Sequence, residues 1–159
     1  MKYWLLKSEP SVFGIDDLRT LPDATEHWDG VRNYQARNFM RDDMKAGDQA
    51  FFYHSNCKEP GIAGIVEIVR EAYPDFTARD PESRYYDPKS TDADPRWYMV
   101  DVRFVRKLEH IVPLTLLKSC PELDGLPLLR RGNRLSIMPV EERFWHFILR
   151  LSEQLSRVS

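Results

Sequence analysis

Aromatic residues at the edges of the predicted elements are the strongest candidates for a functional site in this sequence. Trp28, Tyr53 and Trp97 each stand where an element starts or ends, next to small or polar residues. A pocket for a flat heterocycle requires such planar faces, because stacking a nucleobase on an aromatic ring contributes about 1–3 kcal/mol. The sequence also offers polar side chains that could read the edge of the ring: Ser8, Asn33, Ser55 and Ser136. For Asn33 a helix N-cap is the alternative, which its position before an apolar helical stripe equally favours.

Signatures of catalysis and of metal binding are sparse. The sequence contains no Gly-x-Ser-x-Gly, His-Glu-x-x-His, phosphate-loop or dinucleotide-binding pattern. His54 and Cys57 lie three positions apart and could form a nucleophile pair or two ligands of a metal ion, but no further histidine or cysteine cluster supports either site. We therefore predict no catalytic residue, no metal site and no cofactor. An enzyme that processes a nucleobase or nucleoside with His54 or Cys57 is the alternative hypothesis.

Basic residues gather in two groups although the chain is weakly acidic overall. One group brackets the first long predicted helix and the other surrounds a Gly-Asn turn: Arg32, Arg37 and Arg41, and Arg130, Arg131 and Arg134. Such groups could contact phosphates. For each single arginine, the alternative is a solvated side chain in an ordinary ion pair. The 23 Lys and Arg residues against 25 Asp and Glu give a net charge of −2, which excludes a polybasic protein that coats nucleic acid.

Length and cysteine usage are typical of one cytoplasmic domain. With 159 residues the chain is long enough to bury a core, and we predict a single domain over residues 1–159. Cys57 and Cys120 cannot form a disulfide framework, and they suit a reducing compartment. The first residues are not typical of a signal peptide, and no apolar stretch approaches the roughly 20 residues of a membrane span. We therefore expect a cytoplasmic protein with no membrane partner.

The elements that must position these residues form an irregular mixture of strands and short helices. Apolar or alternating runs predict strands at 2–7, 49–54, 61–71, 97–107 and 135–138. Helical spacing and caps predict helices at 15–19, between Asn33 and Gly47, and at 113–118, 126–131 and 139–151. Gly64 is expected at a bulge or a close approach. Without a βαβ period, this pattern favours a small α+β fold built on a curved or barrel-like sheet.

Residues 72–96 form an unusually long predicted loop. Four prolines and several aspartates punctuate this segment, and a loop of that length in a compact domain is usually functional or disordered. Arg84, Tyr85 and Tyr86 stand in its middle. Their side chains indicate that the loop packs against another part of the molecule.

Several long stretches resemble the EVE-domain family. The first two are WLLKSEP at 4–10 and WDGVRNYQARN at 28–38. FFYHSN at 51–56 and GIAGIV at 61–66 continue the resemblance, and Trp97 with VDV at 100–102 and RLSI at 134–137 complete it. These motifs come in family order and cover residues 2–151, so the chain is similar to the stand-alone bacterial members. Only the proline-rich segment matches loosely.

The resemblance implies an α+β, PUA-like fold, a small mixed β-barrel flanked by short helices. It also implies a module that binds a modified nucleobase, chiefly modified cytosine, in an aromatic pocket, with DNA favoured over RNA as the partner. Carried over by position, Trp28, Tyr53 and Trp97 form the aromatic walls, and Gly30 lets the backbone approach the ligand. The other implied residues line the pocket: Lys7, Ser8, Val31, Asn33, His54, Ser55 and Ser136. Arg32 and Arg37 are the implied phosphate contacts. A module that binds a small molecule or a protein is a further alternative.

Overall fold

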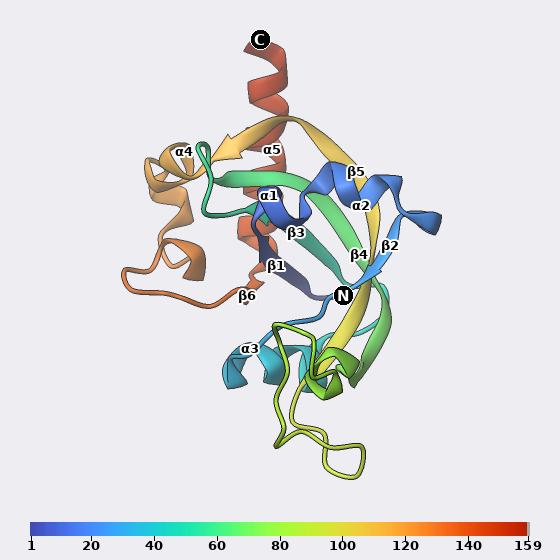
Figure 1. The fold of residues 1–159 in the computed structure, drawn as a ribbon. Coiled ribbons are helices and arrows are strands. Elements are labelled where there is room, and N and C mark those ends of the chain that lie inside the picture. Colours follow the sequence, from blue (N-terminus) through green and yellow to red (C-terminus); the bar gives the residue numbers. More distant parts are fainter. Residues whose placement is uncertain (159) are drawn as a thin grey trace.

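The computed structural model describes residues 1–158, which form one six-stranded mixed sheet (Figure 1). The strand order is β2-β5-β4-β3-β1-β6, in which β1 and β3 run parallel and the other neighbours run antiparallel. The strands are β1 (Tyr3–Ser8), β2 (Thr25–His27), β3 (Gln49–His54), β4 (Gly61–Pro74), β5 (Tyr98–Pro113) and β6 (Ile137–Val140).

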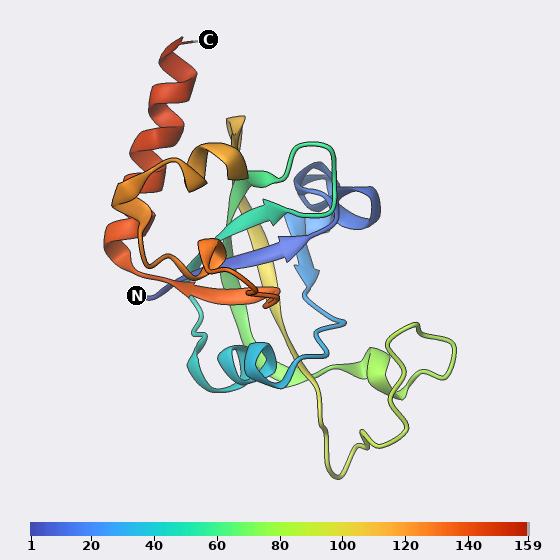
Figure 2. The ribbon, with the colours of Figure 1, turned by 90° about the vertical axis from the view of Figure 1, so that its left-hand side faces the viewer.

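Short helices surround the sheet, and one long helix closes the described chain. The α-helices are α1 (Pro10–Phe13), α2 (Ile15–Thr20), α3 (Tyr34–Asn38), α4 (Leu114–Lys118) and α5 (Glu142–Val158). A π-helical turn, Phe39–Asp43, extends α3, and single 3-10 turns lie at Pro22–Ala24, Phe76–Arg79, Pro121–Leu123 and Pro127–Leu129. The C-terminal end of α5 projects from one end of the molecule, and the long loop before β5 extends at the opposite end (Figure 2).

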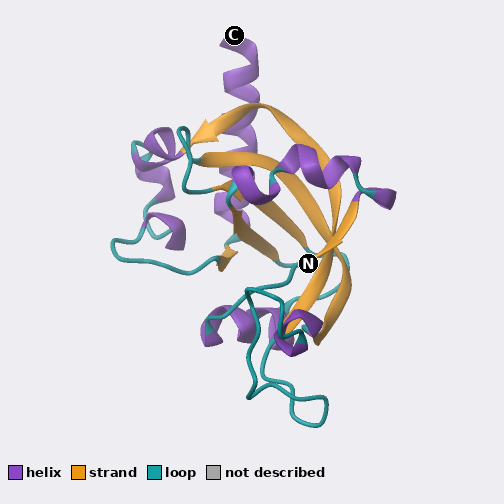
Figure 3. Ribbon diagram, in the orientation of Figure 1, coloured by secondary structure: helices purple, strands orange, loops and turns teal. Residues whose placement is uncertain are grey.

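The sheet is strongly curved but is not a closed barrel, which corrects the expected architecture (Figure 3). In the strand order, β2 and β6 are the two edges, so the hydrogen-bonded ladder ends on both sides. Register shifts interrupt the pairing of β4 with β5 at four places, and bulges of this kind bend a sheet. One shift lies between Ile62 and Gly64, and a Cβ on Gly64 would come within 2.8 Å of the Ile15 side chain. The close approach predicted at Gly64 is thereby confirmed.

Both faces of the sheet are covered, because the central strands are apolar on both sides. In β1 and β3, Leu6 and Phe52 belong to one core cluster, whereas Leu5, Phe51 and Tyr53 belong to the other. The first cluster lies beneath α2 and α3, and the second packs against α4 and α5. Successive side chains of a strand point to opposite faces. This alternation sends Tyr53 to the α5 side of the sheet.

Element boundaries differ from the sequence-based prediction at several places. Pro139 was expected to start the last helix, but it pairs with Trp4 inside β6, and α5 begins at Glu142. An edge strand tolerates proline because the ladder there lacks a partner on one side. The strand β2 lies in a segment that was expected to be loop. Across residues 1–158, no helix combines the length and the apolar character that crossing a membrane requires.

Candidate functional site

A cleft of about 870 Å³ lies between the end of β1, the segment after β2 and the long loop before β5. Trp28 lines it, and eight of the thirteen residues expected at the site lie along its walls: Lys7, Ser8, Trp28, Gly30, Val31, Arg32, Ser55 and Ser136. The ends of β1 and β3 pair side by side at Ser8 and His54, and this pairing brings Ser8 and Ser55 together from distant parts of the chain. The Ser55 N–H donates to the Ser8 carbonyl at 2.9 Å.

Packing and a backbone hydrogen bond hold Trp28 in the cleft wall. Its ring meets Phe52 edge-on with centroids 5.6 Å apart and approaches Phe13 at 6.5 Å. The backbone N–H of Trp28 donates to the Val100 carbonyl at 2.7 Å, which ties the segment after β2 to β5. Trp28 is 8% exposed. A rigidly held aromatic surface of this kind suits a flat ligand, since little conformational freedom is lost on stacking.

The long loop packs onto the cleft through Tyr85, as the sequence indicated. A Cβ on Gly30, which has φ of +78°, would lie 2.5 Å from the nearest Tyr85 ring atom. The Arg32 guanidinium approaches the same ring, with its central carbon 5.4 Å from the ring centroid. Only glycine combines this backbone conformation with so close a neighbour. The missing Cβ of Gly30 therefore makes room for the Tyr85 ring at the cleft wall.

Arg32 holds the long loop against the cleft segment through hydrogen bonds. Its Nε and Nη2 donate to the Tyr85 carbonyl at 3.1 and 2.8 Å, and Nη2 also donates to the Thr77 hydroxyl at 3.3 Å. Its Nη1 donates to the Val31 carbonyl at 3.0 Å and to Asp75 at 3.1 Å. A guanidinium has five N–H groups. All five thus have acceptors within the protein.

The Asp75 side chain is fully buried at the centre of this arrangement. Burial by itself would raise its pKa, but hydrogen bonds from Thr77, Gly30 and Arg32 outweigh that effect and hold the pKa below its usual value. The Gly30 N–H donates to Asp75 at 2.9 Å, and the Thr77 hydroxyl donates to it at 2.6 Å. The carboxylate therefore fixes both the start of the long loop and the cleft segment at Gly30.

Trp97 and Arg37 lie outside the residues that line the cleft. Trp97 is 6% exposed and stacks on Tyr34 with ring centroids 4.8 Å apart. Its indole N–H donates to Asp87 at 2.7 Å, which lowers the pKa of that carboxyl. Arg37 donates to the Arg96 carbonyl at 2.9 Å. These contacts bind the far end of the long loop to α3, and a ligand role for either residue stays a prediction.

Tyr53, His54 and Asn33 also lie outside the cleft lining. Tyr53 is 3% exposed within the core beneath α5, and burial raises its pKa. His54 accepts the Ile15 N–H with Nε2 at 3.2 Å, and burial lowers its pKa. Asn33 accepts the Ala36 N–H at 3.0 Å and caps α3, so the N-cap that the sequence equally favoured is confirmed.

The sequence did not predict several of the charged residues that line the cleft as site residues. Asp29 directly follows Trp28, and burial raises its pKa. Arg84 lies over the Tyr85 ring at 5.0 Å, and Arg134 enters from the loop before β6. The basic residues were visible as members of the long loop and of the second arginine group. Asp29 gave no signal beyond its place in the Trp-Asp-Gly stretch, because a single aspartate in a turn is common.

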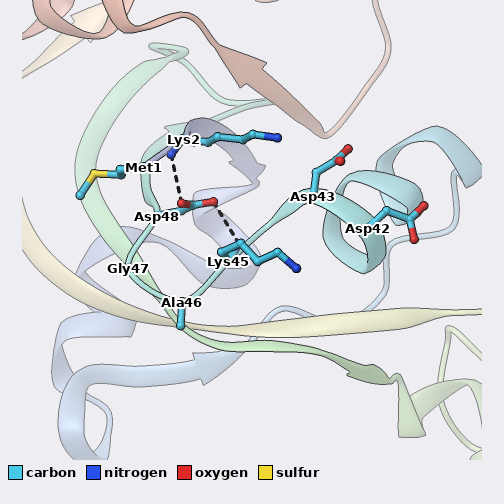
Figure 4. A pocket seen from close by; sticks show the side chains of 8 residues that line it. All are labelled: Met1, Lys2, Asp42, Asp43, Lys45, Ala46, Gly47 and Asp48. Atoms are coloured by element: carbon cyan, nitrogen blue, oxygen red, sulfur yellow. Dashed lines mark hydrogen bonds between the residues drawn. The ribbon is translucent and has the colours of Figure 1, made fainter.

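A second hollow, of about 500 Å³, lies near the start of β1 and β3 (Figure 4). Its one buried charged residue is Asp48, which accepts hydrogen bonds from the N–H groups of Lys2 and Lys45 at 3.1 and 3.0 Å. The indole N–H of Trp4 donates to the same carboxylate at 3.0 Å. These three donors come from two segments, the start of the chain with β1 and the turn before β3, and Asp48 joins them. Within residues 1–158, no group of three His, Cys, Asp or Glu residues could hold a metal ion.

Comparison with known proteins gives consistent matches along the chain. The family model of the EVE domain matches residues 2–151. Human thymocyte nuclear protein 1 is 49% identical over 168 residues, which cover 96% of this chain and 74% of that protein. A crystal structure from Pseudomonas putida has a TM-score of 0.90 at 51% identity and covers 94% of this chain and 99% of that one. The crystal structure of human THYN1 protein in complex with 5-methylcytosine-containing DNA has a TM-score of 0.90 at 48% identity, over 96% of this chain and 98% of that one.

Proposed function

The chain belongs to the EVE domain family, and we propose that its cleft binds DNA that carries a modified cytosine. The observation that carries this proposal is the complex of the human relative with 5-methylcytosine-containing DNA, because the two chains share one fold over nearly their whole length. The modified base enters the cleft and stacks on Trp28, and the protein acts as a reader rather than as an enzyme.

The cleft has the size and the surfaces that such a ligand needs. Small-molecule sites usually measure about 300–1,000 Å³, and this cleft measures about 870 Å³. Trp28 and Tyr85 supply aromatic surface, and Ser8, Ser55 and Ser136 supply hydroxyl groups along the wall. This division into flat apolar faces and a polar rim is how single bases are usually held.

The arginine side chains at the cleft that remain open for phosphates are those of Arg84 and Arg134. Within the described chain, no hydrogen bond or ion pair joins either guanidinium to another residue, and both lie at the cleft. Arg32 would have to give up a protein acceptor to bind a phosphate. We therefore assign the phosphate contacts next to the cleft to Arg84 and Arg134, ahead of Arg32 and Arg37.

Reaching the cleft requires the base to leave its stack. Flipping a base out of a duplex costs a few kcal/mol and costs less in a single strand or at a mismatch. With a net charge of −2, the protein has little general attraction for DNA to offset that cost. We therefore expect single-stranded or mismatched sites to bind more tightly than a fully paired duplex.

Fluorescence anisotropy with labelled oligonucleotides tests this proposal. Short single- and double-stranded DNAs carrying cytosine, 5-methylcytosine or 5-hydroxymethylcytosine at one position are titrated at two salt concentrations. We expect preference for a modified cytosine, weaker binding at higher salt, and a loss of about 10–100-fold in affinity with Trp28→Ala, since stacking contributes about 1–3 kcal/mol.

Tyr34→Ala is the matched control, because Tyr34 is an aromatic residue that is 51% exposed and does not line the cleft. Its affinity should equal that of the unmodified protein. Loss of binding in Tyr34→Ala with full binding in Trp28→Ala would move the site to α3 and Trp97. No binding of any oligonucleotide by the folded protein would contradict the proposed function.

A further inference from the structure

The cleft carboxylates differ in how fully their oxygens are used. Glu9 accepts a hydrogen bond from the Asn56 amide at 2.8 Å. Glu26 accepts the backbone N–H of His27 at 2.9 Å and also contacts the His27 ring at 2.9 Å. The contact between Asp29 and the His27 Nε2, at 3.9 Å, is too long for a hydrogen bond. Among the described residues, Asp29 is therefore the cleft carboxylate that accepts no hydrogen bond from another residue.

The backbone holds Asp29 in place from both sides. The preceding residue, Trp28, donates its N–H to the Val100 carbonyl at 2.7 Å, and the following residue, Gly30, donates its N–H to Asp75 at 2.9 Å. The Asp29 side chain is 33% exposed, and Asp29 lines the same cleft as Trp28. A carboxylate that no other residue donates to thus lies on a held backbone segment, in the cleft that Trp28 also lines.

The two kinds of charge at the cleft select different edges of a base. Lys7, Arg84 and Arg134 can only donate hydrogen bonds, so they match ring nitrogens, carbonyls and phosphates. An ionised carboxylate can only accept, so it matches an amino group. Cytosine carries an amino group at position 4, whereas thymine and uracil carry a carbonyl oxygen there. A carboxylate facing that carbonyl would be left without a donor.

We propose that Asp29 accepts a hydrogen bond from the exocyclic amine of the bound base and makes the cleft selective for cytosine-type over thymine-type bases. This inference rests on the proposed function and deepens it, because it separates the choice of base from recognition of the modification. Asp29 is then a specificity-determining residue, and Trp28 supplies affinity for either base.

Comparing 5-methylcytosine with thymine tests the assignment. Both bases carry a methyl group at position 5, and they differ at position 4 and in the proton on the neighbouring ring nitrogen. Single-stranded oligonucleotides with one or the other at a single position are titrated against the protein and against Asp29→Asn. We expect a preference of roughly 10–100-fold for 5-methylcytosine, the range for a hydrogen bond to a charged group. In Asp29→Asn this preference should fall by most of that factor, because an amide can also donate to a carbonyl.

Two controls keep the result interpretable. Asp124→Asn makes the same change in charge at an exposed site outside the cleft and should keep the full preference. A third oligonucleotide carries 5-methyl-2-pyrimidinone, which lacks the exocyclic amine without adding bulk. The unmodified protein should bind it about as weakly as thymine, and this arm does not depend on the folding of a variant.

Each outcome bears on the inference. Equal binding of 5-methylcytosine, thymine and pyrimidinone by the unmodified protein would overturn the role of Asp29 and leave the reader function standing. A folded Asp29→Asn variant that keeps the full preference would also overturn it. If the protein binds no oligonucleotide at all, the proposed function fails and this inference fails with it.

Discussion

Alanine at position 30 is expected to drive the Tyr85 ring away from the cleft wall and to destabilise the fold strongly. Gly30 has φ of +78°, and a Cβ there would lie 2.5, 2.6 and 2.8 Å from three atoms of the Tyr85 ring. Left-handed backbone costs a residue with a Cβ about 1–2 kcal/mol. Overpacking adds about 1–3 kcal/mol. We therefore expect Gly30→Ala to lower the free energy of unfolding by about 2–5 kcal/mol.

Gly132 provides a matched control for the backbone contribution. Its φ is +79°, and a Cβ there would meet no heavy atom within 4 Å. Gly132→Ala should therefore cost only the backbone strain of about 1–2 kcal/mol. The difference between the two variants then measures the contact with Tyr85, which we expect to be about 1–3 kcal/mol.

Urea unfolding followed by tryptophan fluorescence gives both values, and a double-mutant cycle assigns them. In a Tyr85→Ala background the clash is gone, so Gly30→Ala should then cost no more than Gly132→Ala. The reasoning is refuted if Gly30→Ala and Gly132→Ala destabilise equally in the unmodified protein. It is also refuted if removing the Tyr85 ring leaves the cost of Gly30→Ala unchanged.

Three further variants test the structural roles of charged and polar groups. Arg32→Lys should lower the free energy of unfolding by about 1–3 kcal/mol, since lysine cannot replace five N–H groups. Limited proteolysis should then cleave the 75–97 loop faster in this variant. An unchanged cleavage rate would contradict the role of Arg32 in holding the loop. Asp48→Ala should lower it by about 1–3 kcal/mol in urea unfolding, because the buried Trp4 indole loses its acceptor; an unaltered midpoint would contradict this account. Burial lowers the pKa of His54, so below the usual pKa of 6.5 the unfolded chain binds more protons and stability falls as the pH falls. His54→Gln should flatten that decline in thermal melts taken across this range, and a decline identical to that of the unmodified protein would exclude His54 as its source.

Local patterns in the sequence predicted the main strands and the helix N-cap at Asn33 correctly. The apolar runs of β1 and β3 and the alternating residues of β5 predicted these strands within one or two residues, except that β5 continues to Pro113. Asn33 was a good N-cap by sequence and caps α3. These features depend on dihedral preferences and hydrogen bonds within a few residues, which the sequence contains directly. The long motifs shared with the EVE family likewise identified the family before the fold was known.

Long-range packing decided which residues border the cleft. Phe52 and Tyr53 are neighbours in an apolar strand, yet they enter opposite cores, because the sheet is covered on both faces. Arg32 stood in a basic group typical of phosphate contacts, but Asp75 and the Tyr85 carbonyl, more than forty residues away, take up its donors. The sequence of each segment by itself does not predict these distant partners.

The sequence by itself therefore determined the family, the main strands, the cap at Asn33 and the presence of a packed long loop. Only the tertiary structure decided that the sheet stays open at β2 and β6, that Tyr85 joins Trp28 at the cleft, and that no other residue donates a hydrogen bond to Asp29 there. The physical reason is the range of the interactions. Periodicity and capping follow from neighbouring residues, whereas the hydrogen-bond partner of a side chain depends on which distant segment folds against it.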